Sequence, residues 1–93
     1  MSRQAAQALL VEEIQRYRSR TYEELLRLRT EVDDYELVGP SGILYGIEVN
    51  AFWDSGKPGD LRVIMAIDGG EVSAGRPISE GFIISPDGSF VGE

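Results

Sequence analysis

The stretch GILYGIEVNAFW, residues 42–53, alternates strictly between two sets of side chains. One set is apolar or aromatic throughout and comprises Ile43, Tyr45, Ile47, Val49, Ala51 and Trp53. The other set is mixed and comprises Leu44, Gly46, Glu48, Asn50 and Phe52. Because successive side chains of a β-strand point to opposite faces, this pattern predicts a long strand with one buried face. We expect the first set to face the helical part of the protein.

The same alternation returns in the later part of the chain, at Leu61, Val63, Met65, Ile67, Phe82 and Ile84. Val72 and Ala74 continue it weakly, and Tyr35 with Leu37 suggests a short opening strand. The connections at 39–42, 54–60 and 68–70 are short and rich in residues that favour turns. Parallel neighbours need a crossover of about a dozen residues, so these short connections predict an antiparallel meander.

The glycines after residue 67 raise the question of a phosphate-binding loop. Neither G-x-x-x-x-G-K-[ST] nor a G-x-G-x-x-G between strand and helix occurs there. Asp68-Gly69-Gly70 instead fits a tight hairpin turn, because these residues readily supply positive φ angles. Pro86 and Gly88 fit a type I turn within residues 85–89. We therefore interpret these glycines as turn residues and predict no cofactor.

Residues 1–38 contain neither glycine nor proline and are rich in helix-forming residues. An apolar stripe with a period of 3.6 residues runs through Leu10, Ile14, Tyr17, Thr21, Leu25, Leu28 and Val32. One helix over residues 3–30 would be about 42 Å long, more than a small sheet can cover. Thr21 to Glu24 reads T-x-x-E, the sequence of a capping box. The sequence therefore predicts a break near Ser19–Thr21, between helices at about 3–18 and 22–30.

A chain of 93 residues is the size of one domain. We expect a single domain over residues 1–93, with a helical segment at 1–31 and a sheet at 34–92. The predicted fold class is α+β, with an N-terminal helix or two helical segments packed on one face of a four- or five-stranded antiparallel β-meander.

Composition narrows the chemistry of this chain. It has no cysteine and no histidine, which excludes disulfides, thiolate zinc sites and Ser-His-Asp catalysis within it. The net charge is −7, and residues 30–93 alone carry three basic and twelve acidic residues. Such an acidic body repels nucleic acid and anionic membranes, so neither is expected as a partner. The lack of cysteine fits a reducing, cytoplasmic location.

Three groups of charged residues are candidates for a binding or catalytic site. The acidic residues Glu31, Asp33, Asp34 and Glu36 suggest Mg²⁺, Ca²⁺ or a basic partner, although a solvated linker explains them more simply. Asp54 and Asp60 could form a carboxylate pair only if they converged, and both residues favour turns. The cations Arg16, Arg20 and Arg27 share a helix face, but interleaved acidic residues disfavour nucleic acid. We predict no catalytic residue and no metal ligand.

Phe52 and Trp53 are neighbours on the predicted strand and therefore point to opposite faces. If Trp53 lies under the helices, Phe52 lies on the other face, where apolar residues gather although Glu48, Asn50, Arg62 and Ser73 also lie there. Apolar patches of this kind often mark interaction sites. The alternatives are that the helical segments split and cover both faces, or that the sheet curls. The predicted interaction surface consists of Leu44, Phe52, Ile64, Ala66 and Ile83.

These features predict a small, acidic, non-enzymatic protein-interaction module that associates through the apolar sheet face. A homodimer is the expected assembly, because closed two-fold pairs are the commonest oligomers, and a single protein partner is the other possibility. The alternative function is a small-molecule-binding domain or an enzyme without histidine or cysteine. Such an enzyme would rely on Asp54, Asp60, Asp68, Lys57 or a tyrosine.

Overall fold

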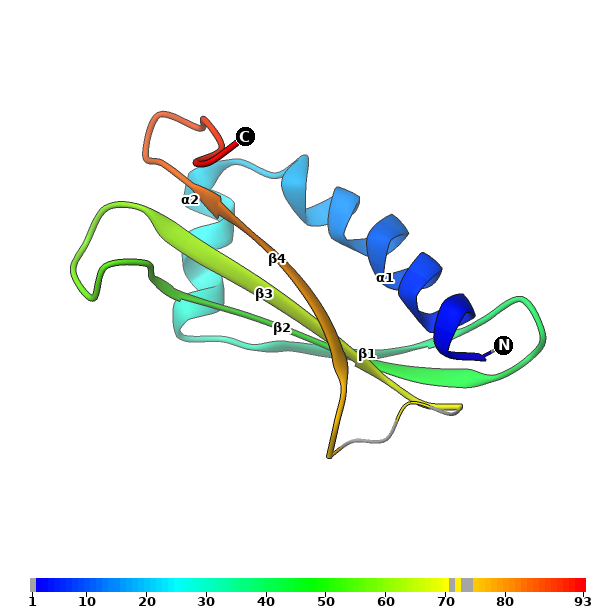
Figure 1. Ribbon diagram of the computed structural model, residues 1–93. Helices are drawn as coiled ribbons and strands as arrows, with labels where there is room; N and C mark the ends of the chain where they lie inside the picture. Colours follow the sequence, from blue (N-terminus) through cyan, green and yellow to red (C-terminus); the bar gives the residue numbers. More distant parts are fainter. Residues whose placement is uncertain (1, 71, 73–74) are drawn as a thin grey trace.

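The computed structural model describes residues 2–70, 72 and 75–93. The chain begins with helix α1 (Ser2–Arg18), the short helix α2 (Tyr22–Leu26) and the 3₁₀ turn η1 (Arg27–Arg29). The described residues then form four strands: β1 (Asp33–Val38), β2 (Leu44–Trp53), β3 (Leu61–Asp68) and β4 (Ile78–Ile84). Figure 1 shows the helices arranged against this sheet, so the predicted α+β class is confirmed.

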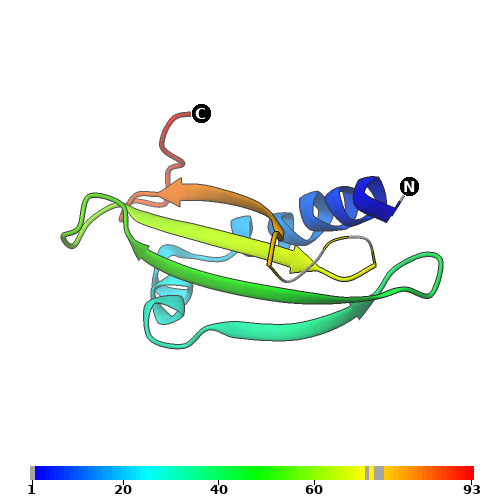
Figure 2. The same cartoon turned by 60° about the horizontal axis from the view of Figure 1, so that its bottom comes forward.

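The strands form one antiparallel sheet in the order β1-β2-β3-β4, so each strand lies beside its neighbour in sequence. Residues 44–49 of β2 pair with β1, and residues 46–53 pair with β3. Residues 61–67 of β3 pair with β4 on the other side. Figure 2 shows the four strands side by side in this order. The meander predicted from the short connections is therefore confirmed.

The tight turn predicted at Asp68–Gly70 is present, but it does not lead directly into β4. Gly69 and Val72 exchange two backbone hydrogen bonds of 2.7 and 2.9 Å. They form an isolated bridge, and β4 begins only at Ile78. The weak alternation at Val72 therefore marks a bridge rather than a strand, and Ala74 lies outside the described residues.

A capping box at Thr21 separates the helices, as the sequence predicts. Its hydroxyl oxygen accepts a hydrogen bond from the Glu24 amide at 3.1 Å, and the Glu24 carboxylate accepts one from the Thr21 amide at 2.8 Å. The break lets α1 lie on β3 and β4 while η1 lies on β2. The second helix becomes 3₁₀ at Arg27 and ends at Arg29. Val32, expected on the apolar stripe, is consequently past the helix and 51% exposed.

The hydrophobic core lies between the helices and the strand face predicted to be buried. Tyr45, Ile47 and Val49 of β2 are at most 1% exposed. Trp53 is only half-buried and stacks against the guanidinium group of Arg29, 4.1 Å from its ring centre. The helices contribute Ala6, Leu10, Ile14, Tyr17, Tyr22, Leu25 and Leu28 to this core.

Residues 90–93 fold back onto the end of α1 (Figure 1). The amide of Val91 donates a 2.9 Å hydrogen bond to the carbonyl of Ile83 in β4. The guanidinium group of Arg18 lies 4.1 Å from the Phe90 ring centre and donates hydrogen bonds to the carboxylate of Glu93. This segment therefore covers the outer edge of β4 at its C-terminal end.

Candidate interaction surface on the open face of the sheet

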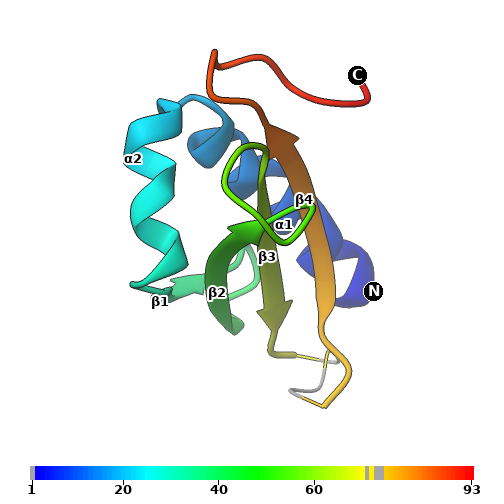
Figure 3. The same cartoon turned by 90° about the vertical axis from the view of Figure 1, so that its left-hand side faces the viewer.

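One face of the sheet has no helix against it in the part of the chain that the structure describes. Figure 3 shows α2, which continues into η1, beside β2, and α1 beside β4. Both contact the face that carries Tyr45 and Ile47, whereas the alternate residues of β2 are half-buried or exposed. The strict alternation of the sequence therefore divides the sheet into a buried face and an open face.

Three of the predicted surface residues gather at one end of the open face, which we call the aromatic end: Phe52, Ile64 and Ile83. Phe52 is 48% exposed, and its backbone pairs with Arg62, which pairs in turn with Ile83. Ile64 lies two residues further along β3, on the same face. Arg62 crosses this end and hydrogen-bonds to Asp54 at 2.9 Å, so its charge is already paired.

Leu44 does not join this end of the face. It is 52% exposed and pairs with Val38 of β1, which is 67% exposed, at the opposite end of β2. Eight residues of strand, or about 26 Å, separate Leu44 from Phe52. Ala66 lies between these ends, opposite Glu48. The predicted five residues therefore share one face but do not form one continuous patch.

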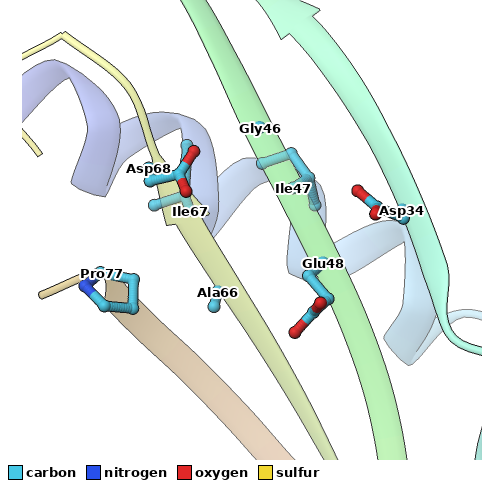
Figure 4. A pocket seen from close by; sticks show the side chains of 8 residues that line it. All are labelled: Asp34, Gly46, Ile47, Glu48, Ala66, Ile67, Asp68 and Pro77. Atoms are coloured by element: carbon cyan, nitrogen blue, oxygen red, sulfur yellow. The ribbon is translucent and has the colours of Figure 1, made fainter. Parts of the chain in front are cut away.

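A depression of about 300 Å³ lies between the two apolar ends of the face. Gly46 and Ala66 lie in its centre, where their small size leaves the sheet surface uncovered. The carboxylates of Asp34, Glu48 and Asp68 surround them, as Figure 4 shows. We call this feature the acidic depression. The acidic depression could not be predicted from the sequence, because its acidic residues come from three strands and meet only through the pairing register.

The predicted acidic group at residues 31–36 is divided by strand β1. Asp33 faces the helices, where its carboxylate accepts a 2.7 Å hydrogen bond from the Tyr17 hydroxyl and lies 3.7 Å from Arg20. Asp34 and Glu36 are exposed on the open side. No group of three or more acidic residues among the described residues is arranged to hold a metal ion.

A network of polar side chains joins α1 to β1 on the helix side. Glu13 is only 8% exposed and accepts hydrogen bonds from Tyr35 at 2.9 Å and Arg16 at 3.3 Å. Burial, reinforced by hydrogen bonds to carboxylates, raises the pKa of Tyr35 and of Tyr17 above the ordinary tyrosine value. Both phenols consequently stay protonated as donors, and the network is structural. Sequence reasoning missed Glu13, since a lone glutamate on a helix normally faces water.

Asp54 and Asp60, which could act as a pair only if they converged, bind different partners instead. Asp54 accepts hydrogen bonds from Arg62, whereas Asp60 accepts one from the Ser85 hydroxyl at 2.8 Å. Lys57 is exposed between them in the loop that joins β2 to β3. Two separate partners hold the two carboxylates, so the structure gives no support to acid–base catalysis by this pair.

Two of the three arginines considered as nucleic-acid contacts form ion pairs within the protein. Arg16 pairs with Glu13, and Arg20 pairs with Asp33 while stacking on Tyr17. The described helices include none that is both long enough and apolar enough to cross a membrane. Comparisons of the chain with protein-family models, curated proteins and solved structures give no match.

Proposed function

We propose that this protein is a non-enzymatic protein-interaction module that docks a protein partner on the open face of its sheet. The exposure of Phe52, on a face against which none of the described helices packs, carries this proposal. A phenyl ring that is nearly half exposed beside Ile64 and Ile83 gains free energy when a partner covers it. The separate partners of Asp54 and Asp60 disfavour an enzyme that relies on these two carboxylates as an acid–base pair.

A second copy of the chain is the less favourable occupant of the whole face. Two such faces packed together would bring the carboxylates of Asp34, Glu48 and Asp68 in each copy near those of the other. One pair of like charges 4 Å apart costs about 1 to 4 kcal/mol, depending on the effective dielectric constant. Pairing through the aromatic end alone avoids this repulsion, but Phe52 offers only about 100 Å² of exposed area. Standard interfaces bury about 800 Å² on each partner.

The homodimer therefore remains a prediction, and a complex with a different protein is the alternative. Light scattering behind size exclusion, between about 1 and 100 μM protein, separates the two cases. A monomer throughout this range is the result that a foreign partner predicts. A stable dimer that Phe52→Glu dissociates would establish self-pairing through the aromatic end instead. The cytoplasmic location also remains a prediction.

Capture of proteins from the source lysate tests the docking face itself. The comparison is between the wild type, Phe52→Ser and Val11→Ser, because Val11 is 46% exposed on α1, away from the open face. We expect Phe52→Ser to lose the partner that the wild type and Val11→Ser both retain. Equal capture by all three proteins would refute docking at this face.

A further inference from the structure

The acidic depression contains carboxylates to which none of the described residues supplies a basic partner. The ion pairs of the described residues lie elsewhere and join Arg16 to Glu13, Arg18 to Glu93, Arg20 to Asp33 and Arg62 to Asp54. None of them includes Asp34, Glu48 or Asp68, which line the depression together. A cation placed here would meet negative charge that the described part of the chain leaves unpaired.

The shape of the depression suits one side chain of a partner. Gly46 leaves its centre open, and a methyl group at that position would come within 2.8 Å of the Asp68 carboxylate. That carboxylate therefore leans over the glycine and reaches the space that a bound group would occupy. The depression is at the lower end of small-ligand pocket volumes, which favours a single inserted side chain over a whole ligand.

The depression and the aromatic end lie at a fixed spacing along β2. Glu48 is four residues from Phe52 and Gly46 is six, which corresponds to about 13 to 20 Å of strand. A partner helix covers this distance in about 9 to 13 residues. The two features therefore form one composite surface, with negative charge at one position and apolar area at the other.

We infer that the open face takes a basic amphipathic segment, which inserts a lysine or arginine side chain into the acidic depression and lays apolar side chains on the aromatic end. This inference rests on the proposed docking function and adds the chemistry of the partner. Complementary charge would select and orient such a segment, while the buried apolar area would supply most of its affinity. The depression contributes specificity because a neutral or acidic segment leaves its carboxylates unpaired.

Three synthetic helical peptides of 18 residues serve as probes, since about 27 Å of helix matches the length of the face. One contains leucine along one face and lysine elsewhere, the second replaces lysine by glutamate, and the third replaces leucine by serine. Binding is measured by calorimetry at about 20 mM and about 300 mM NaCl. The higher salt concentration screens interactions between exposed charges. We expect the Leu–Lys peptide to bind at least about tenfold more tightly than the other two, and more weakly in high salt.

Variants assign this binding to the two parts of the surface. Glu48→Gln and Asp34→Asn should each weaken the Leu–Lys peptide by up to about fivefold, as expected for partly exposed charge pairs. Glu23→Gln removes the same charge from the exposed surface of α2 and should leave binding unchanged. Phe52→Ser should weaken binding more than Val11→Ser. Circular dichroism confirms that each variant is folded.

The outcomes separate this inference from the proposed function. Equal binding of the Leu–Lys and Leu–Glu peptides, no binding of the Leu–Lys peptide, or no effect of Glu48→Gln would overturn the basic partner. In two of these cases, the Leu–Lys and Leu–Glu peptides bind equally or Glu48→Gln has no effect. If Phe52→Ser still weakens binding in either case, the proposal of docking on the open face is retained. If Phe52→Ser and Val11→Ser have the same effect, the docking face itself is wrong.

Discussion

Gly46 offers a substitution that should stabilise the fold while blocking the acidic depression. This glycine lies within β2 and does not have a positive φ angle, so alanine can adopt its backbone conformation. Glycine inside a strand costs about 0.5 to 1 kcal/mol relative to alanine, because it loses more conformational freedom on folding. The added methyl group would come within 2.8 Å of the Asp68 Oδ1 atom, the end of a flexible side chain that can rotate away. We therefore expect Gly46→Ala to raise the free energy of unfolding by up to about 1 kcal/mol.

Gly81 of β4 provides the matched control. A methyl group there would lie 2.6 Å from the backbone carbonyl oxygen of Val63 and 2.8 Å from Ile64 Cδ1. Backbone of a central strand cannot move aside as a carboxylate can, so overpacking at Gly81→Ala should cost about 1 to 3 kcal/mol. Both substitutions add one methyl group to a strand of the same sheet, but they should change the free energy of unfolding in opposite directions.

Thermal unfolding followed by circular dichroism, together with urea titration, measures both effects. A change of 1 kcal/mol shifts Tm by about 4 to 8 °C for a domain of this size. Tm should rise by a few degrees for Gly46→Ala and fall by at least about 4 °C for Gly81→Ala. Gly46→Ala should also weaken the Leu–Lys peptide, because the methyl group fills the depression. A loss of stability of equal size in both variants would refute this account of the two contacts.

Other parts of the structure give further predictions. Thr21→Ala removes one half of the capping box and should lower the free energy of unfolding by about 0.5 to 2 kcal/mol in urea titrations, whereas serine at this position should restore most of it. Burial and the hydrogen bond to Glu13 raise the pKa of Tyr35, so stability from its protonated phenol is complete below about pH 10 and falls as the pH rises further. Tyr35→Phe should flatten this alkaline loss in melts recorded between about pH 8 and 12, and an unchanged slope would contradict the network. Arg18→Ala removes a cation–π contact of about 0.5 to 1 kcal/mol and should speed hydrogen exchange of the Val91 amide by about two- to fivefold.

The parts of the fold that follow from local chemistry could be predicted from the sequence. The alternation around Tyr45 and Ile47 identifies both a strand and its buried face, because side-chain direction in a strand depends only on parity. The break at Thr21 could be predicted because a capping box involves residues only three apart. The open face followed from the same parity, which is why Phe52 was placed on it correctly.

Features that depend on pairing between distant segments could not be predicted. The acidic depression exists because the register places Asp68 opposite Gly46 and Asp34 opposite Glu48. Register is set by turn geometry and by packing over the whole sheet, and a shift of one residue would separate these groups. The burial of Glu13 likewise depends on a residue of another element. Tyr35 of β1 donates a hydrogen bond to the Glu13 carboxylate, which offsets the cost of burying this polar group.

The most direct test of the docking surface is an amide chemical-shift titration of the labelled protein with the Leu–Lys peptide. We expect the largest shifts on β2 and β3, around Glu48, Ala66 and Phe52, and only small shifts for residues on the outer side of α1 such as Val11. Saturable shifts centred on α1, with the open face of the sheet unchanged, would contradict this expectation.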